Sequence, residues 1–457
     1  MTQELLTVGV TGLTQADVEN VSARRDEPAW LRDQRLASWR AFESMDFPDI
    51  YDEEWRRTDV RALTFDRLRA LSASAPVTGP GELPASVRSA WGEGALGGRI
   101  VQHDSDVVRT ELDEALRSRG VILTDMHTAA REHADLFREH FAQTVPAAEW
   151  KYLALNAALW SGGCFLYVPK DVEIALPVQL ATLVSAEGLA LFPRTLIVVE
   201  RNAKVTFIDE TLSPDAATKS FVSGAVEIVV ADGATVEYYD VNNWGSNVCN
   251  FKTVRATLGR DASFRAAAVG IGSKLTKMRI DTLMPQPGAR AELLGVTFGD
   301  KDQHFDYNTL QDHVGEHTIS DLQFKSALTD SASLVWYGIT RIEPPAAGSE
   351  ANQTSRNLLL SEHAKASPIP VLEIEAWDVS KCSHGATAGP VDENELFYLQ
   401  ARAIPREVAE RMLVEGFFAD VIDRIPDARL RDRVLSAVLA KAGGSAGMVS
   451  FDDVLNA

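Results

Sequence analysis

Two side chains in the C-terminal part of the sequence could bind iron or sulfur together. Cys382 and His384 lie two residues apart in the segment KCSHG at 381–385. If this segment is a β-strand, both side chains point to one face about 7 Å apart, so a thiolate and an imidazole could reach one metal ion or one sulfur species. Two ligands do not complete a metal site. A half-buried cysteine beside a hydrogen-bonded histidine at the rim of the fold is the structural alternative, and the spacing alone favours it.

A histidine pair further upstream matches a zinc-peptidase pattern. HVGEH at 313–317 has the form H-x-x-E-H, in which two histidines on one helix face bind zinc and the glutamate acts as a base. The flanking segments FDYNTLQD and TISDLQF are typical of strands, however, and residues four apart on a strand are about 13 Å apart. Gly315 also disfavours a helix. We therefore interpret the match as accidental.

The sequence lacks the glycine-rich motifs that bind phosphates. No G-x-x-x-x-G-K-[ST] segment occurs, and VGIGSKLTK at 269–277 has the wrong spacing to hold a phosphate ahead of a helix. The Gly-Gly pairs at 97–98 and 162–163 do not form G-x-G-x-x-G after a strand. We therefore expect neither ATP hydrolysis nor dinucleotide binding from this chain alone.

Composition and charge exclude several classes of protein. The 457 residues are 45% hydrophobic and 24% charged, which excludes a mainly disordered chain. The net charge of −20 opposes binding to nucleic acid or to anionic membranes. The sequence has neither an apolar run long enough to span a membrane nor the pattern of a signal peptide, so we expect a cytoplasmic protein. The three cysteines are too far apart for a disulfide framework or a CxxC metal site.

Helices followed by a linker are expected over residues 1–98. Apolar residues recur at helical spacing in EPAWLRDQRLASWRAF at 27–42, so we expect helix over much of 16–70. Residues 71–98 are dense in Ser, Pro and Gly, which is typical of a linker. Residues 99–150 predict a mixed α/β segment, with a strand at RIVQ, a helix at 105–118, a strand at VILTDM and a helix at 128–142.

Residues 151–390 predict a solenoid of stacked β-coils. Short runs rich in Val, Ile, Thr and aromatic residues alternate with turns. A turn followed by alanine recurs at Ala203, Ala234, Ala262, Ala289, Ala332 and Ala364. A loose period of about 30 residues is typical of a β-solenoid. An antiparallel sandwich stays possible, because the spacing does not show whether neighbouring strands are parallel.

Residues 391–457 predict a helical region. Pro405 suits a helix start, and a second helix is expected over 427–441 after a break at Pro426. The first helix carries an apolar stripe that includes Met412, Leu413, Phe417 and Phe418. Such a stripe can pack on the solenoid, or it can also serve a partner.

A collinear series of motifs resembles the SufB/SufD family of iron–sulfur cluster assembly proteins, and its SufD branch most. The segments that carry the resemblance are DHVGEHTISDLQFKSAL at 312–328, NQTSRNLLLSEHAKASPIPVLEIEAWDV at 352–379, KCSHGATAG at 381–389 and ELFYLQARAIPREVAERMLVEGF at 395–417. EPAWLRDQRL and EEWRRTDV near the N-terminus are similar to the family as well. The resemblance covers most of the chain and is weakest over 71–150.

The resemblance implies a mainly β fold, with a right-handed parallel β-helix core between N-terminal and C-terminal helical regions. It implies a non-catalytic assembly subunit that pairs with a SufB-like paralogue through the β-helix. It also implies that a SufC-like ABC ATPase docks on the C-terminal helices, which makes the stripe Met412, Leu413, Phe417 and Phe418 a candidate contact. Nucleotide-driven motion of the ATPase would then shift these helices and open the interface.

Two positions separate the branches of the family. SufB-type chains carry a sulfur-accepting cysteine where this sequence has Ser355, and a glutamate after the histidine where it has Gly385. Cys382 and His384 match the CSHG motif of the SufD type instead. The resemblance therefore implies that His384, and after it Cys382, contributes to iron or cluster binding at the interface with the partner.

Cofactors and alternatives follow from the same resemblance. We expect no cofactor bound stably by the isolated chain, a transient iron or iron–sulfur cluster in the complex, and possible use of a reduced flavin. One alternative is a SufB-like scaffold that acts as a homodimer, against which Ser355 and Gly385 argue. A more remote alternative is a carbohydrate-active enzyme on a β-helix, with acidic residues such as Asp281 and Asp306 along one flank.

Overall fold

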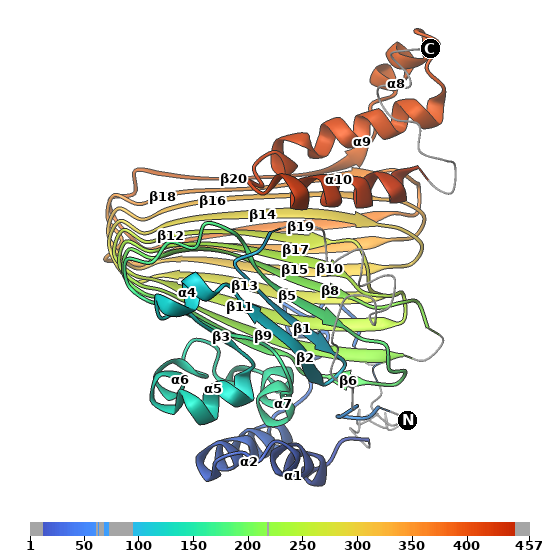
Figure 1. Ribbon diagram of the computed structural model, residues 1–457. Helices are drawn as coiled ribbons and strands as arrows, with labels where there is room; N and C mark the ends of the chain where they lie inside the picture. The colour runs from blue at the N-terminus through green and yellow to red at the C-terminus, as the bar shows by residue number, and fades with distance from the viewer. Residues whose placement is uncertain (1–11, 61–62, 64–67, 73–94, 217–218, 444–457) are drawn as a thin grey trace, which may run out of the picture.

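Two facing sheets of parallel strands form a β-solenoid of about eight turns, with helices at both ends (Figure 1). The computed structural model describes residues 12–60, 63, 68–72, 95–216 and 219–443. The predicted mainly β fold and the parallel solenoid are therefore confirmed, and the antiparallel sandwich is wrong.

The first sheet ends in β20, and we call it the β20 sheet. Its strand order is β2-β1-β5-β8-β10-β12-β14-β16-β18-β20. The strands are β1 (Gly98–His103), β2 (Asp106–Leu112), β5 (Val178–Leu183), β8 (Lys204–Leu212), β10 (Thr235–Asn243), β12 (Ser263–Gly270), β14 (Arg290–Gly299), β16 (Ile319–Leu328), β18 (Glu350–Leu359) and β20 (Lys381–Pro390). All neighbours are parallel except β1 and β2.

The second sheet ends in β19, and we call it the β19 sheet. Its order is β19-β17-β15-β13-β11-β9-β7-β4-β3, and β6 pairs with β9. The strands are β3 (Ile122–Thr124), β4 (Phe165–Val168), β6 (Ala190–Leu191), β7 (Arg194–Val199), β9 (Ser220–Val230), β11 (Val248–Leu258), β13 (Leu275–Met284), β15 (His304–His313), β17 (Ser333–Ile342) and β19 (Lys365–Ile374).

The recurring alanines mark the corners of the solenoid. All six are at least 95% buried. Asn202, Gly233, Asp261 and Gly288 directly precede four of them and have positive φ angles of 56°, 67°, 53° and 74°. Asn, Asp and Gly tolerate this left-handed backbone, and the small side chain that follows fits inside the coil. The turn-then-alanine signature is thus a consequence of the corner geometry.

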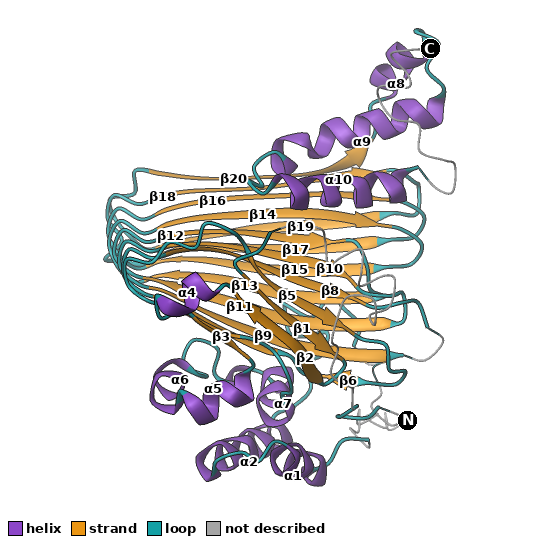
Figure 2. Ribbon diagram, viewed as in Figure 1, coloured by secondary structure: helices purple, strands orange, loops and turns teal. Residues whose placement is uncertain are grey.

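The N-terminal helices cover the outer face of the β19 sheet at its first turns (Figure 2). Helix α1 spans Gln15–Arg24 and α2 spans Ala29–Ser44. Of the helix expected across 16–70, residues 45–60 form turns instead. This segment is held by tertiary packing, because Trp55 lies against Trp150, Tyr152 and Phe251. Residues 61–62 and 64–67, like most of the linker expected over 71–98, lie outside the described residues.

Residues 98–159 differ most from expectation. The strand at RIVQ is confirmed as part of β1, which pairs with β5 and so belongs to the solenoid. The helix expected over 105–118 is wrong, because 106–112 form β2 and only α4 (Glu114–Ser118) is helical. The helix expected over 128–142 is divided into α5 (Met126–Glu132) and α6 (Ala134–His140). After the short 3-10 turn η2 (Ala147–Glu149), residues 151–159 form the buried helix α7 (Lys151–Leu159), not a strand.

Three helices follow the last strand. They are α8 (Glu393–Gln400), α9 (Arg406–Ile422) and α10 (Ala428–Ala442), so the two predicted C-terminal helices are confirmed. Helices α9 and α10 pack on the outer face of the β20 sheet, mainly against β14 and β16, whereas α8 projects beyond the solenoid and contacts α9 (Figure 1). Among the described residues, no helix is long and apolar enough to cross a membrane.

Candidate functional site

The last coil of the solenoid carries both candidate ligands. It consists of β19, the connection 375–380 and β20, and we call it the open end. Each of its strands is the last in its sheet among the described residues, so each has one edge without a neighbouring strand. The strand placement expected for KCSHG is confirmed, because the segment begins β20.

Cys382 points into the end of the solenoid. It pairs in register with Ala351 of β18 and packs with Ile342 and Ala346. The thiol is partly exposed, and its partial burial raises the pKa above the usual value. The isolated chain therefore holds Cys382 as a thiol at neutral pH, and it would have to lose a proton to bind a metal.

His384 lies on the same face of β20, one step along the strand. It pairs in register with the buried Gln353 of β18, but no further coil covers it and it is exposed. The Gln353 Nε2 atom donates a hydrogen bond to the Val371 carbonyl at 2.9 Å, and its Oε1 atom has no partner in the part of the chain that the structure describes. The exposed His384 imidazole therefore lies at the end of the solenoid, next to the buried polar side chain of Gln353.

Further buried polar side chains lie on β18, the neighbouring strand of β20. Ser355 is 1% exposed and lies in register with Ala386. The Asn357 Nδ2 atom donates to the Ser355 hydroxyl at 3.1 Å and to the Thr387 carbonyl at 2.9 Å. The position at which the resemblance places the cysteine of SufB-type chains is therefore inside the solenoid, next to the strand that carries His384. The sequence did not predict this polar set, because only the register between β18 and β20 brings it together.

Gly385 is not required by the backbone. A Cβ atom at this position would meet only the Thr354 Cγ2 atom, at 3.9 Å, which is an ordinary contact. A larger side chain therefore fits there, so a steric need does not explain the glycine.

The H-x-x-E-H match has no metal-binding geometry. His313 ends β15 and is buried, and its two ring nitrogens lie 2.8 Å from the hydroxyls of Thr318 and Ser320. His317 has a φ of 55° in the following turn, so the segment is not a helix. Burial lowers the pKa of His313 to about 4, which keeps it neutral. The interpretation of this match as accidental is confirmed.

Among the described residues, the open end presents one thiol and one imidazole but no complete metal site. Within the described residues, no group of three or more His, Cys, Asp or Glu side chains is placed to hold a metal ion. Iron accepts both thiolate and imidazole ligands, so Cys382 and His384 form a partial ligand set, and the described residues do not supply the rest of one.

The apolar stripe of α9 is mostly a packing surface. Phe418 is fully buried with Val414, Val421 and Ile422 against the β20 sheet. Met412, Leu413 and Phe417 are half-buried, and a partner could reach Phe418 only if α9 moved. More exposed apolar area lies on α8, where Phe397 is 73% and Tyr398 57% exposed.

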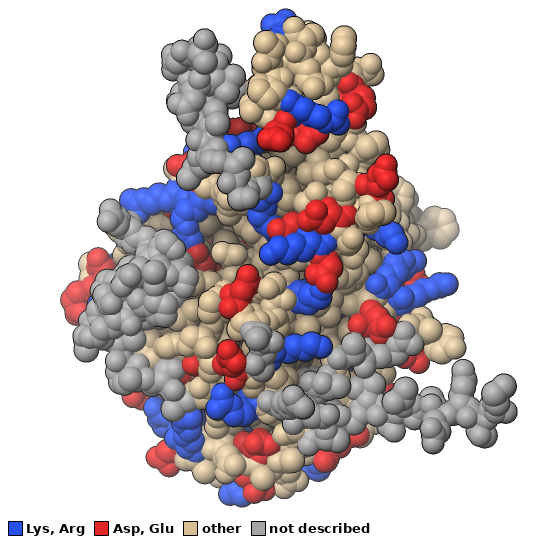
Figure 3. Space-filling view, turned by 90° about the vertical axis from the view of Figure 1, so that its right-hand side faces the viewer, with Lys and Arg blue, Asp and Glu red and all other residues tan. Residues whose placement is uncertain are grey.

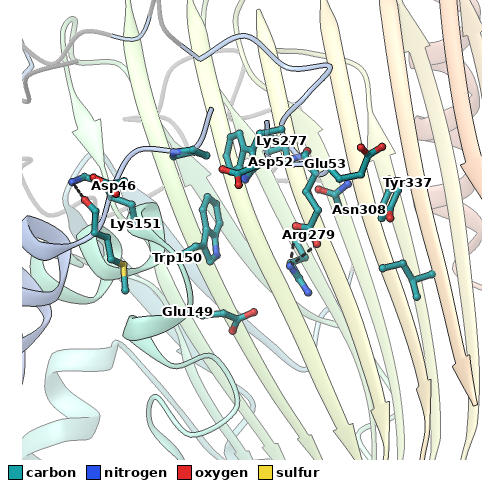
Figure 4. A pocket seen from close by; sticks show the side chains of 15 residues that line it. Asp46, Asp52, Glu53, Glu149, Trp150, Lys151, Lys277, Arg279, Asn308 and Tyr337 are labelled. Carbon is teal, nitrogen blue, oxygen red and sulfur yellow. Dashed lines mark hydrogen bonds and ion pairs between the residues drawn. The ribbon is translucent and has the colours of Figure 1, made fainter. Parts of the chain in front are cut away.

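A cavity of about 590 Å³ lies away from the open end, between residues 45–55, the 149–151 segment and the outer face of the β19 sheet (Figure 4). Two of its three lining cations are paired with carboxylates, and the third, Lys151, donates to the Met45 carbonyl. Arg279 binds Glu54 at 3.0 Å, and Lys277 binds Asp306 at 2.8 Å and lies over the Trp55 ring. These contacts fasten the N-terminal segment to the sheet. The sequence did not predict this cavity.

Charges of both signs are interspersed on the face shown in Figure 3, where Lys and Arg side chains lie beside Asp and Glu. Ion pairs between the C-terminal region and the β20 sheet include Lys325 with Asp420 and Arg424 with Asp321. Among the described residues of this face, the basic side chains therefore do not gather into one extended surface for a polyanion.

Comparison with known proteins identifies relatives over nearly the whole chain. A sequence profile described as "SUF system FeS cluster assembly, SufBD core domain" matches residues 182–417, and one described as "SufBD protein N-terminal region" matches residues 100–180. The chain is 31% identical over 425 residues to the iron-sulfur cluster assembly protein SufB of Bacillus subtilis (strain 168), which covers 91% of this chain and 90% of that protein. The same identity and coverage relate it to an iron-sulfur cluster assembly SufBD family protein of Staphylococcus epidermidis (strain ATCC 12228 / FDA PCI 1200).

Proposed function

Since the chain belongs to the SufBD family of iron–sulfur cluster assembly proteins, we propose that it is a SufD-type subunit that pairs with a SufB-type paralogue. The observation that carries this proposal is the composition of the open end. His384 and Cys382 lie at the mouth of the solenoid, whereas Ser355 and Gly385 replace the cysteine and glutamate of the SufB type. The chain can thus supply ligands to a cluster without the residue that accepts sulfur.

The nascent cluster, or the iron that enters it, is the cargo of the complex. The two ligands of this chain are a thiol and an imidazole, both of which bind iron. Because they do not complete a site, the partner's open end would supply the others. A site divided between two subunits is complete only in the assembled complex, which explains why the chain alone needs no closed metal site.

A SufC-type ABC ATPase is the second proposed partner, and the C-terminal helices are its proposed docking region. Support comes from the exposed aromatic pair Phe397 and Tyr398 on α8 and from the half-buried Met412, Leu413 and Phe417 on α9. The chain itself would be non-catalytic, since ATP hydrolysis would reside in the partner. We also propose that it is cytoplasmic. Use of a reduced flavin stays a prediction, to be tested by flavin fluorescence of the purified complex.

The test is co-purification of the tagged chain with its partners, followed by iron and sulfide analysis. We expect SufB-type and SufC-type subunits to be recovered with the wild type. The His384→Ala complex should assemble but carry much less iron and sulfide, and Cys382→Ala should show a smaller loss. His363→Ala, an exposed histidine in a solenoid turn, is the matched control. Normal iron in the His384→Ala complex would refute the ligand role.

A SufB-like scaffold that acts as a homodimer is the second candidate function. The observation that favours it is the name of the Bacillus subtilis relative, which is SufB. This candidate predicts that the isolated chain assembles a cluster when iron and sulfide are supplied. The first proposal predicts that it does not, so reconstitution on the isolated chain separates the two.

A further inference from the structure

The cavity between residues 45–55 and the outer face of the β19 sheet is large enough for a small molecule, and we call it the β19-face cavity. Its volume of about 590 Å³ lies within the roughly 300–1,000 Å³ that is usual for ligand pockets. It lies away from the open end, so a ligand bound there would be separate from the cluster chemistry of the proposed function.

Asn308 lies on the floor of the β19-face cavity without a hydrogen-bond partner. Phe305 and Tyr307 of β15 belong to the core inside the solenoid, so Asn308 points to the outer face, between Arg279 of β13 and Tyr337 of β17 in register. It is 4% exposed, and neither its Nδ2 nor its Oδ1 atom has a partner among the described residues. Because a buried amide without partners is costly, its donor and its acceptor are both available to a ligand.

Aromatic side chains stand on both sides of this amide. In Figure 4 Trp150 and Tyr337 lie to either side of Arg279 and Asn308, and both aromatic residues line the cavity. Both are half-buried, and the Trp150 Nε1 atom also has no partner in the described part of the chain. A planar ring can therefore stack on one of these side chains while its edge reaches the Asn308 amide.

The free amide selects the kind of ring. The common nucleobases carry an N–H donor next to an acceptor on one edge, and an asparagine side chain forms two hydrogen bonds with such an edge. A hydrocarbon ring would leave both polar atoms of Asn308 unpaired, and a carboxylate would pair only with the Nδ2 atom. The amide together with the aromatic walls therefore fits a nucleobase.

The charges around the cavity disfavour a phosphate. Five carboxylates line it, namely Asp46, Asp52, Glu53, Glu54 and Glu149. The three lining cations, Lys151, Lys277 and Arg279, already bind acceptors of this chain. Asp46 and Asp52 are exposed and form no ion pair with a described residue. A phosphate at the rim would therefore meet negative charge that no cation offsets.

We propose that the β19-face cavity binds a nucleobase, presented by an uncharged nucleoside rather than by a nucleotide. The base lies inward, where it forms two hydrogen bonds with Asn308 and stacks on Trp150 or Tyr337. The sugar lies toward the rim, because Asp46 and Asp52 are exposed whereas Asn308 is buried. The lack of a glycine-rich phosphate-binding motif in the sequence agrees with a ligand that carries no phosphate.

Ligand-detected NMR titration of the full chain with adenosine, cytidine and uridine tests the proposal. We expect at least one nucleoside to bind with a Kd below about 1 mM, and its 5′-monophosphate to bind at least about tenfold more weakly. The proposal is refuted if none of the three binds below about 1 mM. A monophosphate that binds as tightly as its nucleoside overturns the choice of an uncharged ligand.

Asn308→Leu tests the two hydrogen bonds, with Asn243→Leu as the matched control. Leucine is close to asparagine in size, and the two polar atoms it removes have no partner among the described residues, so we expect the fold to be kept. Asn243 is exposed at the end of β10, in the other sheet. Asn308→Leu should weaken nucleoside binding at least about tenfold, whereas Asn243→Leu should bind like the wild type. Unchanged binding by Asn308→Leu would contradict the proposed role of the amide.

Asp46→Asn combined with Asp52→Asn gives a second readout that loss of structure would not mimic. We expect the nucleoside affinity to stay within about twofold of the wild type. The affinity for the monophosphate should rise roughly three- to tenfold at low salt, because two negative charges are removed from the rim. An equal change for both ligands, or none for the monophosphate, would overturn the placement of the sugar at the rim.

Discussion

Phe418→Ala should weaken the packing of α9 on the solenoid. This variant therefore tells residues of the α9 apolar stripe that pack on the sheet from residues that bind a partner. Phe418 is fully buried and packs edge-on against Phe417, with ring centroids 5.1 Å apart. Its cluster also includes Leu294, Val296 and Phe298 of β14. Truncation of such a side chain leaves a cavity and costs about 3–5 kcal/mol, because the surrounding strands of a solenoid cannot close around it.

The expected magnitude is large enough to measure by hydrogen exchange. Since about 1.4 kcal/mol corresponds to tenfold, α9 amides should exchange roughly 10²- to 10⁴-fold faster in Phe418→Ala. Met412→Ala is the matched comparison on the same helix. Met412 is half-buried, so its truncation should cost about 1 kcal/mol and change exchange by less than about tenfold.

Binding of the SufC-type subunit is measured on the same variants. We expect Met412→Ala to weaken binding with little change in exchange, whereas Phe418→Ala should change both. If the α9 amides of Phe418→Ala exchange at the wild-type rate, the packing role derived from its burial is wrong. If Met412→Ala binds the ATPase normally, the stripe is not the docking surface, and α8 with its exposed aromatic pair becomes the better candidate.

Three further perturbations test other parts of the molecule. Burial lowers the pKa of His127 to about 4. Between pH 6.5 and 4 the unfolded state therefore binds a proton at this histidine that the folded state does not bind, so the free energy of unfolding falls. From pH 7 to 4 the free energy of unfolding of His127→Gln should fall by about 3 kcal/mol less than that of the wild type, because the lowered pKa values of His313 and His304 act in both proteins. The lowered pKa of Glu27 acts only between pH 4.5 and 2. Lys252→Met should cost about 3–5 kcal/mol at pH 7, because it leaves Asp209 and Asp240 buried without their cation. The deficit should shrink at pH 5, and an equal deficit at both pH values would contradict this. Gly385→Glu should change the unfolding free energy by less than about 0.5 kcal/mol in denaturant titrations, because the position is open.

Local signals predicted the solenoid, because its corners depend on single residues. Asn202 and Asp261 adopt positive φ angles, and an alanine that must fit inside the coil follows each. Such a signature requires no knowledge of the partner strand. The placement of Cys382 and His384 on one strand face was predictable for the same reason, since alternation along a strand is a local property.

Long-range contacts explain what the sequence did not predict. Residues 106–112 have helical spacing but form β2, because β1 offers them an edge to pair with. The segment 45–60 is held in turns by the contacts of Trp55 rather than by its own helical pattern. The apolar stripe of α9 predicted an amphipathic helix, but it did not show that Phe418 is the residue covered by the sheet.

The proposed site and the proposed docking region are connected by a short covalent path. Only two residues separate Pro390 at the end of β20 from Glu393 at the start of α8. Helix α9 packs on β14 and β16, which are separated from β20 by two strands and one strand. Lys325 of β16 forms an ion pair with Asp420 of α9, and Arg424, just past α9, forms one with Asp321 of β16. A movement imposed on α9 is therefore resisted by the body of the solenoid, whereas a movement of α8 is transmitted directly to the strand that carries Cys382 and His384. If the ATPase controls the cluster interface, α8 is the element best placed to transmit its motion to β20.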